Sequence, residues 1–183
     1  MSRVLVIIPI CLLLIFFPSP LGYMIACIFA SYAMVTDYFD GYLSRKWGVT
    51  SDFGRLLDPI ADKLLIAALL ILLTVHGHGH PLAVILIMLR EITVSALREF
   101  TQERGVVLHV TMIAKYKTTL QMIAAFGLLI SGMFPEHIGL HYSAEGLLWA
   151  ASWLTCYTGY DYFKEAMRQC VDKPDKSASG ETE

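Results

Sequence analysis

The chain has 183 residues, of which 56% are hydrophobic and 16% charged, and its formal net charge at pH 7 is −2. This composition is more apolar than that of ordinary soluble domains, and no basic stripe interleaved with aromatic residues indicates a nucleic-acid partner. The 4 cysteines show no C-x-x-C spacing, so the sequence predicts neither a disulfide framework nor a zinc site.

Apolar segments follow one another along the chain at 4–17, 21–43, 56–75, 81–99, 117–134 and 143–163. A helix needs about 20 residues to cross a hydrocarbon core of about 30 Å. The first segment, which Pro18 ends, is short for a span; it is either interfacial or the remainder of a longer helix. We expect an all-α integral membrane protein with six transmembrane helices.

The basic residues alternate between the ends of these segments, which predicts an orientation. Lys and Arg flank one set of ends, whereas the connections at 18–20, 76–80 and 135–142 contain neither. By the positive-inside rule, both termini and the connection after the second segment face the cytoplasm. We expect one catalytic domain over residues 1–171 and a polar, disordered cytoplasmic tail over 172–183.

Four aspartates sit where the second and third segments meet. Asp37 and Asp40 are three residues apart, and Asp58 and Asp62 are four apart, so each pair shares one face of a helix. Four carboxylates in one small volume require compensating positive charge. Hard oxygen ligands of this kind suit Mg²⁺, Mn²⁺ or Ca²⁺, and the pattern therefore predicts a divalent metal site.

The stretch from Asp37 to Asp62 resembles the motif D-x-x-D-G-x-x-A-R-x8-G-x3-D-x3-D of the CDP-alcohol phosphotransferases. Every defining position matches except the alanine, which is Ser44 here. The resemblance implies that the four aspartates bind Mg²⁺ or Mn²⁺ on a CDP diphosphate and that Asp62 is also the general base. It further implies a nucleotide site formed by Gly41, Ser44, Arg45 and Gly54.

Basic residues on the fourth and fifth segments point to the second substrate. Arg90 and Arg98 are eight residues apart, about 12 Å along a helix and roughly on one face. Arg90 lies inside an apolar stretch and needs an anionic partner; adjacent Glu91 is expected to point elsewhere on the helix. With Lys115 and Lys117 opening the fifth helix, the pattern predicts a phosphate-bearing acceptor.

The stretches R-E-I-T-V-S-A-L-R-E-F and I-A-K-Y-K-T-T-L-Q-M resemble the phosphatidylglycerophosphate synthase branch of this family. The resemblance implies CDP-diacylglycerol and glycerol 3-phosphate as substrates, a bacterial inner membrane location and a homodimer. The implied acceptor-phosphate site comprises Arg90, Arg98, Lys115 and Lys117. Arg3 matches the last position of a motif resembling N-x-x-T-x-x-R, so we expect an N-terminal segment shorter than is usual in the family.

Other interpretations remain open at this stage. Within the family, the acceptor could be phosphatidylglycerol, as in cardiolipin synthesis, or inositol phosphate. A divalent-cation channel or transporter would also carry acidic residues, but they would be distributed along a pore rather than clustered at one side. A catalytically silent homologue is a third possibility, because the expected N-terminal segment is short.

Overall fold

The computed structural model describes the backbone of residues 2–47, 52–103 and 113–172 and the side chains of 6–36, 60, 63–102 and 117–168. Within these ranges all regular secondary structure is α-helical. The helices are α1 (Ser2–Phe16), α2 (Pro20–Trp47), α3 (Asp52–Val75), α4 (Pro81–Glu103), α5 (Ile113–Met133) and α6 (Ile138–Asp172). Each predicted apolar segment thus corresponds to a helix, and the tail after Asp172 lies outside the described residues.

Local signals in the sequence explain where several helices begin and end. Pro20 and Pro81 each open a helix, where a missing N–H has no cost. The Ser19 hydroxyl caps α2 by accepting a hydrogen bond of 3.2 Å from the Gly22 N–H. At the end of α3, Gly77 has φ of +78° and the His78 N–H bonds the Leu73 carbonyl at 2.8 Å, which is a Schellman motif.

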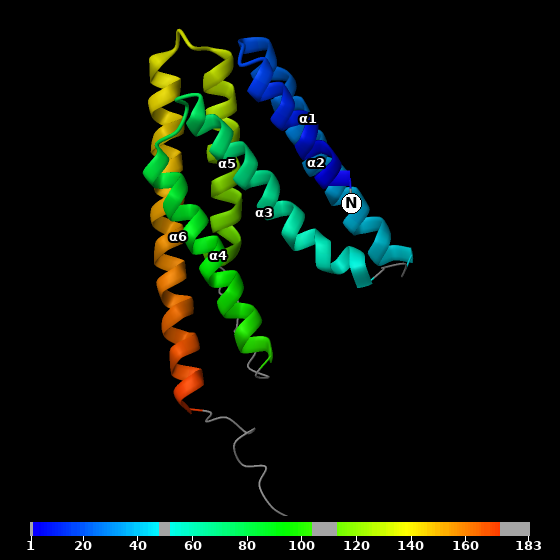
Figure 1. The fold of residues 1–183 in the computed structure, drawn as a ribbon, viewed down its shortest axis with the longest axis vertical. Coiled ribbons are helices and arrows are strands. Elements are labelled where there is room, and N and C mark those ends of the chain that lie inside the picture. The colour runs from blue at the N-terminus through cyan, green and yellow to red at the C-terminus, as the bar shows by residue number, and fades with distance from the viewer. Residues whose placement is uncertain (1, 48–51, 104–112, 173–183) are drawn as a thin grey trace, which may run out of the picture.

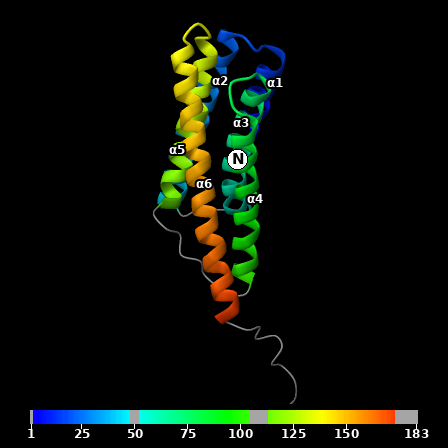
Figure 2. The ribbon, with the colours of Figure 1, turned by 90° about the vertical axis from the view of Figure 1, so that its left-hand side faces the viewer.

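The six helices form a bundle in which α6 packs against both α4 and α5, while α1 packs against α2 and α3. Figure 1 shows α4, α5 and α6 running together on one side, and α1 and α2 as a tilted pair on the other. Helix α3 crosses between the two groups and contacts α1, α4 and α5. Turned by 90°, the molecule shows α4 and α6 lying side by side over much of their length (Figure 2).

The described turns all gather at one end of the bundle. Figure 1 shows the α1–α2, α3–α4 and α5–α6 turns toward its upper end. The last residues of α2, α4 and α6 and the first residues of α3 and α5 therefore lie toward the other end. The Asp motif, Arg98, Lys115 and Lys117 belong to this second end, whereas Arg90 lies near the middle of α4.

An apolar core with many small side chains holds the helices together. Ala26, Ala30 and Ala33 of α2 are at most 1% exposed, and small residues at such positions allow neighbouring helices to approach closely. Leu73 of α3 and Leu128 of α5 are fully buried in the same cluster. A smaller cluster of Tyr162 and Ala166 of α6, with Val94 and Leu97 of α4, extends the packing toward the second end.

Large apolar side chains also cover the outside of the bundle. Leu82, Ile85, Leu89 and Ile92 follow one face of α4 and are between 50% and 69% exposed. Within the residues that the structure describes, no helix combines the length and the mean apolarity that a membrane span requires. The predicted crossings stay a prediction.

The core can be tested by comparing two truncations in α3. Leu73→Ala removes a fully buried side chain and is expected to lower the free energy of unfolding by about 2–5 kcal/mol, because a cavity remains. Ile71→Ala, at a position 49% exposed, should cost about 1 kcal/mol or less. Denaturant unfolding of both purified variants measures the difference; equal losses would contradict the assigned burial.

Candidate functional site

The centre of the site is a group of three charged side chains that are largely removed from solvent. The side chains of Arg90, Glu91 and Lys117 are 8%, 17% and 7% exposed, respectively. Arg90 and Glu91 lie on α4, and Lys117 lies near the start of α5. Charges in such surroundings are stable only when they are paired and hydrogen-bonded.

Glu91 provides that pairing for both cations through a single carboxylate oxygen. Its Oε1 accepts hydrogen bonds from the Lys117 ammonium and from Arg90 Nη1, the second at 3.4 Å. The Gln121 Nε2 amide lies 3.4 Å from the same oxygen. The expectation that Glu91 points away from Arg90 was therefore wrong, because the long arginine side chain bends back toward its neighbour on the helix.

Helix α6 supplies the hydroxyl groups that complete the network. Arg90 Nη2 donates to Thr158 Oγ1 at 3.1 Å, and Gln121 Nε2 donates to Thr155 Oγ1 at 3.0 Å. The two threonines are three residues apart and both are buried, so they present one polar face of α6 to α4 and α5. The network thereby fixes three helices relative to one another.

A small cavity of about 190 Å³ opens beside this network. Among the described side chains that line it, four are cationic and one is a carboxylate, so the net charge of these side chains is positive. Such a volume suits a small ligand better than a drug-sized one. The lining residues are Lys63, Arg90, Glu91, Val94, Ser95, Arg98, Lys117, Thr118 and Tyr162.

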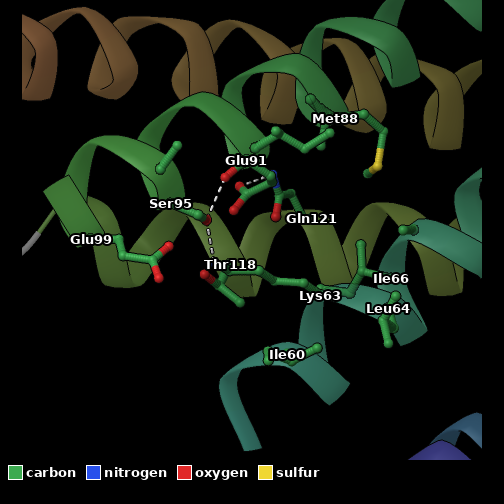
Figure 3. A pocket seen from close by; sticks show the side chains of 14 residues that line it. Ile60, Lys63, Leu64, Ile66, Met88, Glu91, Ser95, Glu99, Thr118 and Gln121 are labelled. Atoms are coloured by element: carbon green, nitrogen blue, oxygen red, sulfur yellow. Dashed lines mark hydrogen bonds between the residues drawn. The ribbon is translucent and has the colours of Figure 1, made fainter. Parts of the chain in front are cut away.

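A larger and mainly apolar groove of about 660 Å³ adjoins the cavity. Lys63, Glu91, Ser95 and Thr118 line both spaces, so the two are continuous. Figure 3 shows Lys63 reaching from α3 toward Ser95 of α4, whose hydroxyl accepts its hydrogen bond. The apolar wall is made by Ile60, Leu64, Ile66, Ala67, Ile87, Met88, Ile92 and Ala96.

The structure brings together three of the four predicted acceptor-phosphate residues. Arg90, Arg98 and Lys117 line one cavity, as the eight-residue spacing and the fifth-helix position indicate. Lys115 lies in α5, but its side chain lies outside the described residues. Lys63 joins the group without having been predicted; its one sequence signal is that it directly follows Asp62 in the motif.

The side chains of the predicted metal and nucleotide sites lie outside the described residues. Their helices are described: the first group belongs to the end of α2 and the second to the start of α3. Within the described side chains, no group of three or more His, Cys, Asp or Glu could hold a metal ion. These predicted residues are Asp37, Asp40, Gly41, Ser44 and Arg45 on α2 and Gly54, Asp58 and Asp62 on α3.

Comparisons with known proteins cover almost the whole chain. A family model for CDP-alcohol phosphatidyltransferase matches residues 1–158. The chain is 41% identical to a CDP-diacylglycerol–glycerol-3-phosphate 3-phosphatidyltransferase of Rickettsia bellii, over 86% of this chain and 87% of that protein. Proteins of the same name are 34% identical in Cereibacter sphaeroides, over 90% of this chain and 91% of that protein, and in Salmonella typhimurium, over 92% of each.

The charge network predicts a strong effect of neutralising its one carboxylate. Glu91→Gln keeps the shape of the side chain but leaves the Lys117 ammonium buried without an anion, and should lower the free energy of unfolding by about 3–5 kcal/mol. Lys117→Met in the same chain should recover part of that loss, and a double-mutant cycle measures the coupling.

Glu99→Gln is the matched control, since Glu99 is an exposed acid two turns further along α4. Its cost should stay within about 0.5 kcal/mol. Additive effects of Glu91→Gln and Lys117→Met would show that the two side chains are not energetically coupled.

Proposed function

The chain belongs to the CDP-alcohol phosphatidyltransferase family, and from this premise we propose that it transfers a phosphatidyl group from CDP-diacylglycerol to sn-glycerol 3-phosphate. The products are phosphatidylglycerol phosphate and CMP. The observation that carries the choice of acceptor is the small cavity lined by Lys63, Arg90, Arg98 and Lys117. A phosphomonoester dianion compensates these charges, whereas a neutral alcohol does not.

The acceptor cavity also lies next to the helix that carries the predicted base. Lys63 lines the cavity and directly follows Asp62 in α3. Neighbouring helix residues are separated by only 1.5 Å along the axis, so Asp62 belongs to the same turn of α3 as Lys63. This supports a geometry in which the phosphate of the acceptor sits among the cations while its hydroxyl group approaches Asp62.

The proposed reaction is a displacement at the phosphorus atom that carries diacylglycerol. The acceptor hydroxyl oxygen forms a new bond to this phosphorus, the bond between phosphorus and the CMP oxygen breaks, and Asp62 takes the hydroxyl proton. Asp37, Asp40, Asp58 and Asp62 have the donor chemistry to hold Mg²⁺ or Mn²⁺. When bound, that ion supplies positive charge for the diphosphate. Gly41, Ser44, Arg45 and Gly54 would contact the nucleotide.

We place the helices in the bacterial inner membrane, with the catalytic end and both termini facing the cytoplasm. The support is the apolar outer face of α4 and the aromatic face of α6, where Trp153, Tyr157 and Tyr160 are between 60% and 74% exposed. Apolar surfaces of this kind mark contacts with membranes or other proteins. A homodimer is part of the proposal, and the molecular mass of the purified detergent complex tests it.

A CMP-release assay tests the function directly. Purified protein with CDP-diacylglycerol should release CMP only when glycerol 3-phosphate and a divalent cation are both present, and EDTA should abolish the release.

Asp62→Asn should reduce turnover by about 10²–10⁴-fold, because the base is lost. CMP release with inositol phosphate or phosphatidylglycerol, but not with glycerol 3-phosphate, would transfer the assignment to another member of the family. Flux of Mg²⁺ across liposomes without CMP release would indicate a transporter.

Arg98 provides the test of the acceptor site. Arg98→Ala should raise the KM for glycerol 3-phosphate roughly 10- to 100-fold, the value of a lost charge-assisted contact, while the KM for CDP-diacylglycerol changes little. Arg168→Ala, at an exposed arginine of α6 that lines neither described cavity, is the matched control. Equal changes of both KM values in Arg98→Ala would contradict the acceptor role.

A further inference from the structure

Gly159 of α6 lies directly against the side chain of Arg90. A Cβ atom built at this glycine would stand 2.8 Å from Arg90 Cγ and 3.4 Å from Nε. Carbon atoms do not approach so closely without displacement, because preferred separations are about 3.5–4.0 Å. The arginine therefore passes α6 at a place that only a glycine leaves open.

The neighbours of Gly159 hold the far end of the same arginine. Thr158 Oγ1 accepts the hydrogen bond from Arg90 Nη2 at 3.1 Å, and the Tyr162 ring centre lies 5.8 Å from the guanidinium carbon, within the range of a cation–π contact. From the opposite side, Glu91 Oε1 contacts Nη1 at 3.4 Å. We call Thr158, Gly159 and Tyr162 the Arg90 seat.

One polar atom of the Arg90 side chain makes no hydrogen bond to the described residues. Arg90 Nε is buried and has no hydrogen-bond partner among the described residues, although Arg90 itself lines the cationic cavity. The position of this guanidinium is thus set by its bonds to Glu91 and Thr158 and by packing against Gly159 of α6. A donor group held in place before the ligand arrives binds without a further ordering cost.

Building on the proposed function, we infer that Gly159 is a positioning residue for the acceptor site. Through the Arg90 seat it sets the direction in which the Arg90 guanidinium meets the acceptor phosphate. Helix α6 then contributes to the positioning of the acceptor, although none of the predicted acceptor residues belongs to it. If Gly159 served only helix packing, its substitution would change the stability of the protein but would not change the KM of one substrate more than that of the other.

The test compares two glycines of one helix. Gly159→Ala should raise the KM for glycerol 3-phosphate roughly tenfold, through a displaced charge-assisted contact, and should leave the KM for CDP-diacylglycerol unchanged. Gly146→Ala is the control, since Gly146 is exposed on α6 and no described atom lies within 4 Å of the added carbon. Initial rates of CMP release and the Tm are measured for both variants. An unchanged KM for glycerol 3-phosphate in folded Gly159→Ala would overturn the inference.

A second pair of variants covers the case in which Gly159→Ala does not fold. Thr158→Val keeps the side-chain volume but removes the hydroxyl that Arg90 Nη2 contacts, so it should raise the same KM, and Thr158→Ser should restore it. If Thr158→Val behaves like the native chain, the seat has no positioning role.

Arg90→Ala separates this inference from the proposed function on which it rests. If Arg90→Ala leaves the KM for glycerol 3-phosphate unchanged, the assignment of Arg90 to the acceptor fails, and the seat fails with it. If Arg90→Ala raises that KM while Gly159→Ala and Thr158→Val do not, the acceptor site stands and the seat alone is overturned.

Discussion

Two buried cations share one partly buried carboxylate in this bundle, and the candidate site is built around that imbalance of charge. Glu91 contacts both Arg90 and Lys117 through the same oxygen atom. One anion cannot neutralise two cations, so the described side chains compensate only half of this positive charge. The Thr158 hydroxyl of α6 reduces the cost by accepting a hydrogen bond from Arg90 without contributing charge. The remaining demand for negative charge is directed toward the cavity, where Arg98 and Lys63 add to it.

In the proposed function, this imbalance favours a phosphate-bearing acceptor over a neutral one. A neutral alcohol would lose its own hydration on entry and leave the cations as they were. A phosphate group accepts several charge-assisted hydrogen bonds at once and removes the excess positive charge. Specificity in such a site comes from groups that would stay unpaired with the wrong ligand. The family membership of the chain shows the class of reaction. The positive charge of the described cavity residues supports the proposal of a phosphate-bearing acceptor.

Much of the helical layout could be predicted from the sequence because it follows from local patterns. Apolar segments, Pro20, Pro81 and Gly77 mark helices and turns through short-range chemistry. Arg90 and Arg98 could also be assigned to one cavity, since helix periodicity alone puts them on one face. Thr158, which bonds Arg90, and Gln121, which bonds Glu91, could not be predicted as partners, because they meet α4 only through the packing of α4, α5 and α6. The role of Glu91 was missed for another reason: backbone directions separate adjacent helix residues, but a long, flexible arginine side chain can bend back to its neighbour.

In the proposed reaction, acceptor binding and proton transfer belong to two different parts of the bundle. The cations belong mainly to α4 and α5, with α6 behind them, and they hold the acceptor by its phosphate. The predicted base belongs to α3, which reaches the same cavity through Lys63. Binding and proton transfer are therefore assigned to different helices, and the contact of α3 with α4 and α5 sets the distance between the two functions. Lys63 also donates a hydrogen bond to Ser95 across the interface of α3 and α4. Since an error of about 1 Å in such positioning can cost about 10²-fold in rate, helix packing far from the reacting phosphorus becomes part of catalysis.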